Sequence, residues 1–164
     1  EFEEAEQRVQ SQIDAFITNK GTKTVDYFHR KLGKIIWNKC GMSRNEKDLK
    51  EAMAEVKALR EEFYKDVFVP GTADSFNEPL AKALRVADFL ELGELFAKDA
   101  LVRTESCGGH FREESQSPEG EALRDDDNFT FVSAWEYKGE PSDAELHKEA
   151  LNYENIELKT RSYK

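Results

Sequence analysis

Apolar residues recur every three or four positions over most of the first hundred residues, which is the spacing of amphipathic helices. Four segments show this pattern, and they predict helices at about residues 2–19, 24–40, 43–67 and 75–104. The pattern therefore predicts a mostly α fold, built on a bundle of three to four helices with the up-and-down arrangement of a spectrin repeat.

Residues that favour helix ends mark the boundaries of these segments. Gly21 is expected to close the first helix in a left-handed conformation. Ser43 and Ser75 each stand three positions before a glutamate, and this capping-box spacing predicts the starts of the third and fourth helices. Pro70 and Gly71 stop the third helix, because proline cannot continue it.

The apolar stripes predict which faces are buried. In the first helix, Phe2, Ala5, Val9, Ile13, Phe16 and Ile17 share one face and are expected to point inward. The fourth helix is apolar over most of its circumference between Leu80 and Val102. Such a helix needs neighbours on several sides, so we expect the bundle to dock on another body.

The composition changes after Thr104. Residues 105–128 are rich in glycine, serine and charge, and they predict a long loop. Residues 129–137 predict an aromatic strand, residues 142–145 a short helix, and residues 155–160 a final strand that pairs with the first. The chain is thus expected to divide into a helical bundle (1–104) and a loop with an extended C-terminal arm containing a small β element (105–164).

Charge narrows the choice of partners. The net charge is −10, of which −2 falls in residues 1–104 and −8 in residues 105–164. An acidic arm repels phosphate backbones, so no nucleic-acid partner is expected, and a basic protein surface suits it better. No run of 18 apolar residues is present, so no direct insertion into a membrane is expected.

The two cysteines and the first residue give weaker indications. Cys40 and Cys107 stand in different contexts and do not predict a disulfide framework, which favours a reducing, cytosol-facing compartment. Glu1 opens directly into a helical pattern without a preceding methionine. We therefore expect the chain to be cut from a longer polypeptide.

Two candidate chemical sites lie after residue 104. Cys107 and His110 have the spacing of a metal-ligand or catalytic pair, but a structural zinc site needs four ligands and no second Cys/His pair is present. The acidic run Asp125–Asn128 suggests a calcium loop, but the position that requires glycine holds Thr130. A solvated acidic turn or a helix cap is the favoured interpretation of that run.

Motifs for catalysis and cofactor binding are missing from the sequence. No glycine-rich dinucleotide fingerprint follows a strand, and no phosphate loop or alternating strand–helix pattern occurs. We therefore predict no catalytic, cofactor-binding or metal-ligating residue in this chain.

Two strings in the arm resemble a known family. Residues 105–113 read Glu-Ser-Cys-Gly-Gly-His-Phe-Arg-Glu, which closely resembles the Glu-Ser-Arg-Gly-x-His-x-Arg-Glu signature of succinate dehydrogenase and fumarate reductase flavoprotein subunits. Residues 124–129 resemble the Arg-Asp-Asp-x-Asn-Phe/Trp element of the same family, and residues 160–163 resemble its C-terminal ending. One position departs from the signature, because Cys107 stands where the family has an arginine with up to five donors.

The resemblance implies the C-terminal domain of such a flavoprotein. The parent protein would interconvert succinate and fumarate with FAD and pass electrons to an iron–sulfur subunit, while this chain would hold no cofactor. The implied partners are the flavin domain of the same polypeptide and the iron–sulfur subunit, in a complex peripheral to the cytoplasmic side of the inner membrane. The matched motif positions are the expected domain-docking residues: Glu105, Ser106, Cys107, Gly108, Gly109, His110, Arg112, Asp126 and Asn128.

A second hypothesis belongs to a different class. A free-standing helical interaction module with an acidic tail explains the bundle, the helix caps and the uneven charge equally well. It leaves the match to the signature loop unexplained. Binding to a separately expressed flavin domain discriminates between the two hypotheses.

Overall fold

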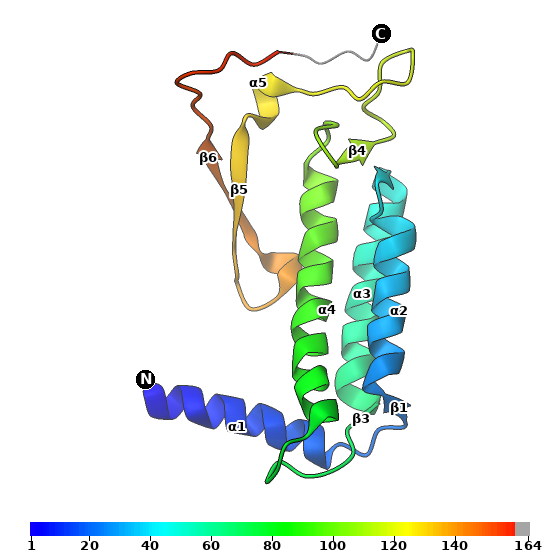
Figure 1. Ribbon diagram of the computed structural model, residues 1–164, viewed down its shortest axis with the longest axis vertical. Coiled ribbons are helices and arrows are strands. Elements are labelled where there is room, and N and C mark those ends of the chain that lie inside the picture. Colours follow the sequence, from blue (N-terminus) through cyan, green and yellow to red (C-terminus); the bar gives the residue numbers. More distant parts are fainter. Residues whose placement is uncertain (160–164) are drawn as a thin grey trace.

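The long helices that follow the first one stand side by side, and the first helix crosses their lower end (Figure 1). The structure is a computed structural model that describes residues 1–159. In chain order its elements are α1 (Phe2–Thr18), β1 (Lys23–Thr24), α2 (Val25–Lys39), β2 (Ser43–Arg44), α3 (Glu46–Asp66), β3 (Val67–Phe68), α4 (Glu78–Val102), β4 (Phe111–Arg112), α5 (Asp126–Phe129), β5 (Phe131–Glu136), the 3₁₀ turn η1 (Pro141–Asp143) and β6 (Glu145–Ala150). The expected class, a helical bundle followed by a loop and a small β element, is confirmed.

The hydrophobic core lies between α2, α3 and α4, with the end of α1 packed against it. Phe28 and Phe63 are fully buried, and their ring centroids are 5.2 Å apart in an edge-to-face contact. Phe16 brings α1 to the same cluster, 5.5 Å from Phe63. Aromatic pairs of this geometry add to the stability that burial alone provides.

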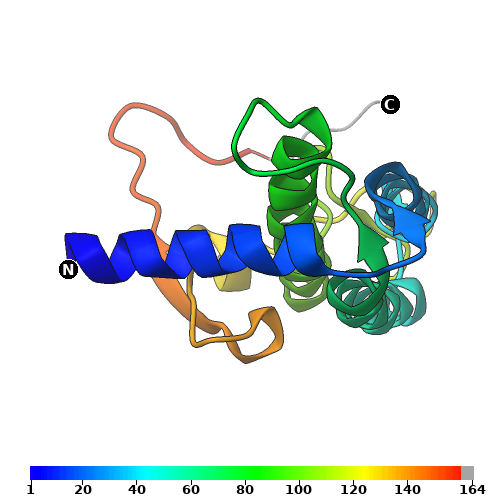
Figure 2. The same cartoon turned by 90° about the horizontal axis from the view of Figure 1, so that it is seen from below.

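The inward stripe predicted for α1 is wrong for its first half. Phe2 is 93% exposed and Val9 is also exposed, whereas Phe16 is buried. The helix leaves the bundle on the side of the β5–β6 hairpin, so only its last turns reach the core (Figure 2).

The turn after α1 also differs from the prediction. Gly21 does not adopt a left-handed conformation, and α1 ends at Thr18, followed by the C-cap residue Asn19 with an extended backbone. Glycine is needed at position 21 for a different reason: a Cβ atom there would lie 2.2 Å from the carbonyl carbon of Asp66. The two chain segments therefore approach more closely than any side chain allows.

Asparagine side chains, rather than the predicted serines, cap the third and fourth helices. The Asn45 carboxamide oxygen accepts a hydrogen bond from the Asp48 N–H, and Asn77 accepts one from the Leu80 N–H. Both residues lie two positions after the predicted caps, and asparagine is an equally good acceptor at this position. Ser43 instead belongs to β2 and donates its hydroxyl to Glu113.

Two short parallel pairings join the ends of the helices. β1 pairs with β3, with Lys23 opposite Val67, and this ties the start of α2 to the end of α3. β2 pairs with β4, with Ser43 opposite Phe111, and this ties the start of α3 to the loop that follows α4. The bundle is therefore fastened by backbone hydrogen bonds at both ends.

The small β element is the antiparallel β5–β6 hairpin, in which Phe131 lies opposite Ala150 and Glu136 opposite Glu145. It lies beside α4, where the Lys98 ammonium donates to the carbonyl oxygens of Ser142 (2.9 Å) and Ala144 (2.7 Å). The prediction that residues 155–160 supply the second strand is wrong for residues 155–159, because β6 takes that place.

Two further predictions are not decided by the structure. The family-like ending at residues 160–163 lies outside the described residues. The division of the chain at residue 104 stays a prediction.

Candidate docking site

Arg112 anchors the loop that follows α4. Its side chain is only 3% exposed, and its Nη1 donates to the carbonyl oxygens of Ala100 (3.0 Å) and Leu101 (3.1 Å) in the last turn of that helix. Its Nε pairs with the Glu114 carboxylate at 3.1 Å. These carbonyls have no partner within the helix, and a cation at a helix C-terminus is favourable. Arg112 therefore fixes the loop to the end of α4.

Ser106 and Glu105 hold the beginning of the same loop, and both are buried. The Ser106 hydroxyl accepts from the Arg112 N–H (2.8 Å) and donates to the Arg112 carbonyl (3.2 Å). The Glu105 carboxylate accepts from the Arg103 guanidinium (2.7 Å) and from the Asp125 N–H (2.9 Å). The Glu105 carboxylate thus links the two motif elements, and these predicted docking residues act here as an internal frame.

His110 links the loop to the bundle through both nitrogens of its ring. Nε2 donates to the Arg103 carbonyl at 2.8 Å, and Nδ1 accepts from the Arg44 guanidinium at 2.8 Å. This arrangement requires a neutral ring with its proton on Nε2. Since neither nitrogen is left for the Cys107 thiol, the geometry does not assemble a catalytic Cys–His pair.

We expect the pKa of His110 to lie below its ordinary value of 6.5. Burial lowers the pKa of His110, and the nearby guanidinium groups of Arg44, Arg112 and Arg103 disfavour a second positive charge. Its contribution to stability is therefore present above pH 6.5 and is lost as the pH falls through the lower pKa of the folded state. Nitrogen-15 NMR of the imidazole ring measures both tautomer and pKa. A pKa at or above 6.5 contradicts the expectation.

Cys107, Gly108 and Gly109 form the exposed tip of the loop. Cys107 and His110 exchange two backbone hydrogen bonds of 2.8 and 3.0 Å, and Gly108 turns the chain with a φ of +59°. A Cβ atom added at either glycine would meet nothing within 4 Å. The tip is therefore open on its outer side, with a free thiol at its base.

The second motif element is a capped helical turn. Asp125 caps α5 by accepting from the Asn128 N–H (3.2 Å), and the Asn128 amide also donates to it. Arg124 forms a two-pronged ion pair with Asp126 at 2.6 and 2.7 Å. Internal donors therefore occupy these carboxylates, in agreement with a helix cap rather than a calcium loop.

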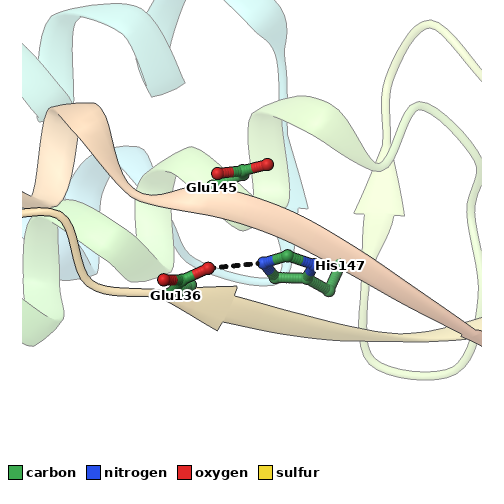
Figure 3. A group of neighbouring side chains, drawn as sticks. All are labelled: Glu136, Glu145 and His147. Carbon is green, nitrogen blue, oxygen red and sulfur yellow. Dashed lines mark hydrogen bonds and ion pairs between the residues drawn. The ribbon is translucent and has the colours of Figure 1, made fainter.

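The β5–β6 hairpin brings together three side chains that the sequence analysis did not connect, namely Glu136, Glu145 and His147 (Figure 3). Their ligand-capable atoms lie within 4.8 Å of one another, and His147 Nε2 is 2.8 Å from Glu136. The Lys138 ammonium forms ion pairs with both carboxylates, at 2.5 Å from Glu136 and 3.4 Å from Glu145. All four side chains are exposed, so the group is an ion-pair network on the surface.

An apolar groove runs along α4 beside the hairpin. It comprises two hollows of about 400 and 560 Å³ that share Leu92, Leu95 and Trp135 as lining residues. Phe89 and Phe96 line the larger hollow, and both rings are partly exposed to solvent. We call this surface, defined by these five residues, the α4 groove. It agrees with the expectation that α4 needs additional neighbours.

Comparison with known proteins places the chain in a family. Residues 29–163 match the family model described as "Fumarate reductase flavoprotein C-term". A fumarate reductase (CoM/CoB) subunit of Methanothermobacter marburgensis is 30% identical over 113 residues, covering 69% of this chain and 19% of the relative. The fumarate reductase flavoprotein subunit of Proteus vulgaris is 26% identical over 121 residues, covering 74% of this chain and 19% of the relative.

Solved structures share the fold. A quinol fumarate reductase of E. coli superposes with a TM-score of 0.74 at 19% identity, covering 96% of this chain and 26% of that one. The Mycobacterium smegmatis Sdh1 complex in the apo form gives 0.71 at 24% identity, covering 94% of this chain and 25% of that one. The chain thus spans about a fifth of the length of its curated relatives and about a quarter of these solved chains. Because the family model covers most of the chain, this protein belongs to the family of fumarate reductase flavoprotein C-terminal domains.

Proposed function

We propose that this chain is the C-terminal domain of a succinate dehydrogenase or fumarate reductase flavoprotein, and that its own role is structural: it docks on the FAD-binding part of that protein. The likeness to fumarate reductase proteins of Methanothermobacter marburgensis and Proteus vulgaris supports this proposal. The interconversion of succinate and fumarate, and the transfer of electrons from FAD, belong to the proposed whole protein. This chain contributes no reacting group to them.

The observation that carries the proposal is the construction of the signature loop. Glu105, Ser106 and Arg112 are buried and bonded within the chain, whereas the tip at residues 107–109 is exposed and has open space around it. A loop with a fixed frame and a free tip loses little conformational freedom on binding, which favours recognition of another surface. The docking roles of all nine predicted residues, Asp126 and Asn128 included, remain predictions.

The acidic arm suits a basic partner surface. The family resemblance implies an iron–sulfur subunit, and we propose that the arm contacts this subunit. Within residues 1–159, no helix is both long and apolar enough to cross a bilayer. In the proposed function, attachment to the cytoplasmic side of the inner membrane therefore takes place through the complex.

The two cysteines allow a direct test of docking. Cys107 is exposed and Cys40 is buried, and burial also raises the pKa of the Cys40 thiol. In the free chain, a maleimide reagent is therefore expected to modify Cys107 rapidly and Cys40 slowly. After addition of the separately expressed flavin-binding part of the same flavoprotein, labelling of Cys107 should slow at least tenfold. Mass spectrometry measures both sites in one sample.

The possible results of this experiment distinguish docking through the tip, docking through another surface and no docking. Formation of a stoichiometric complex in which Cys107 is protected supports docking through the tip. A complex in which Cys107 labels at the free rate shows that another surface makes the contact. If no complex forms with a folded chain, the interaction-module hypothesis takes precedence.

A further inference from the structure

We infer that the α4 groove is a second docking surface, which receives an apolar segment of the flavin-binding part flanked by a basic side chain. This inference rests on the proposed function, because it takes the flavin-binding part as the partner. It adds a location and a chemistry for contact that the signature loop does not provide.

The groove exposes apolar surface that a soluble domain ordinarily buries. Leu92 is 59% exposed in the middle of α4, and Phe89 and Phe96 lie one helical turn to either side of it. The two hollows between these residues and Trp135 form one continuous strip, since they share three lining residues. A contiguous apolar strip with polar edges is typical of an interaction surface.

The walls of the groove are held in place. The indole N–H of Trp135 donates to the Asp99 carboxylate at 2.8 Å, and the Lys98 ammonium lies 4.8 Å from the centre of the Trp135 ring. The same ammonium binds the η1 turn, so one lysine positions both the indole and the turn. On the floor, Gly93 leaves room for Leu32 of α2 to pack against α4. The surface is thus preformed rather than created on binding.

The groove is continuous with the signature loop. The Arg44 guanidinium lies 5.0 Å from the centre of the Phe96 ring, and the same guanidinium donates to His110. Arg44 therefore connects one end of the groove to the base of the exposed tip. A single partner body can contact both surfaces, which favours the flavin-binding part as the occupant.

The charged residues at the end of the α4 groove opposite Phe96 indicate which side chains the partner segment carries. Asp88 and Glu91 line the smaller hollow beside Leu92. Neither is within ion-pair distance of a cation among residues 1–159, although the charge of Glu91 contributes to raising the pKa of Arg60. Carboxylates at the rim of an apolar surface favour a partner with a lysine or arginine at the matching position. The occupant is therefore apolar along its centre and basic at the Asp88 end.

Replacing Leu92 by aspartate tests the inference. A buried charge without a partner is unfavourable, so Leu92→Asp is expected to weaken the complex with the flavin-binding part at least tenfold. Phe76→Asp is the matched control: Phe76 is 92% exposed in the loop before α4, away from the groove, and its replacement should leave affinity unchanged. Glu91→Gln should weaken binding mainly at low salt. Affinity is measured by titration calorimetry, and circular dichroism confirms that each variant is folded.

The outcomes distinguish the inference from the proposed function. A tenfold loss for Leu92→Asp but not for Phe76→Asp supports the groove. If the wild-type chain and both variants bind equally, the groove is not an interface, although docking itself stands. If the wild-type chain does not bind, the proposed function fails and the inference falls with it.

Discussion

Replacement of Arg112 by alanine is expected to lower the free energy of unfolding by about 2–5 kcal/mol, because each buried acceptor left without its donor costs about 1–3 kcal/mol. The guanidinium satisfies carbonyl oxygens at the C-terminus of α4 and pairs with Glu114, all at the base of the signature loop. Without it the Ala100 and Leu101 carbonyl oxygens lose their donor. Urea titration followed by circular dichroism measures the change.

Arg124 provides the control for this prediction. It forms a two-pronged ion pair with Asp126 two residues away, but its side chain is much more accessible to solvent. Exposed ion pairs contribute roughly 0–1 kcal/mol, so Arg124→Ala should be nearly neutral. If the two alanine variants unfold within about 1 kcal/mol of each other, Arg112 is not the anchor of the loop.

Replacement of Arg60 by methionine is expected to have an effect of similar size, about 3–5 kcal/mol at pH 8. Arg60 lies between two carboxylates, at 3.2 Å from buried Glu94 and 2.5 Å from Glu140. Its loss leaves the Glu94 carboxylate, only 1% exposed, without its ion-pair partner. Urea titrations at pH 5 and pH 8 measure the free energy of unfolding.

This loss should depend on pH in a defined direction. Burial raises the pKa of Glu94 in the folded protein, and Arg60 opposes that shift. Without Arg60 the pKa rises further, so the folded state binds a proton more readily than the unfolded state. The stability associated with the protonated form is present at low pH and is lost as the pH rises through the folded pKa. The defect should therefore be smaller at pH 5 than at pH 8.

The double variant Arg60→Met with Glu94→Gln is the control. It removes the unpaired buried charge together with its partner, so most of the lost stability should return and the pH dependence should shrink. An equal loss for Arg60→Met at both pH values contradicts the explanation.

The helices could be predicted from the sequence because their periodicity is a local property. The predicted helix at residues 75–104 is α4, observed at Glu78–Val102. The direction of α1 could not be predicted. An apolar stripe indicates that a helix face is to be buried, but it does not identify the element against which that face packs. β6 was missed because its alternation is weak: only Leu146 is partly buried among its six residues, and most of the others are polar.

The residues of the candidate site could be predicted from the sequence, but their contacts could not. The motif identified the loop residues, but not that Arg112 binds carbonyl oxygens of α4, because every residue carries a carbonyl and no pattern marks the partner. The contact of Arg44 with His110 depends on the pairing of β2 with β4, which brings the start of α3 to the loop after α4. The group formed by Glu136, Glu145 and His147 depends on the register of the β5–β6 hairpin, which could not be predicted from the sequence.

The pairing of Ser43 with Phe111 has a consequence for the order of folding. It joins two segments separated by the whole of α3 and α4, and closing so long a loop is entropically unfavourable until those helices have assembled. The signature loop is therefore expected to take its final shape late, after the bundle. A partner that recognises the tip at residues 107–109 would therefore bind only fully folded molecules, because partly folded chains do not present this surface.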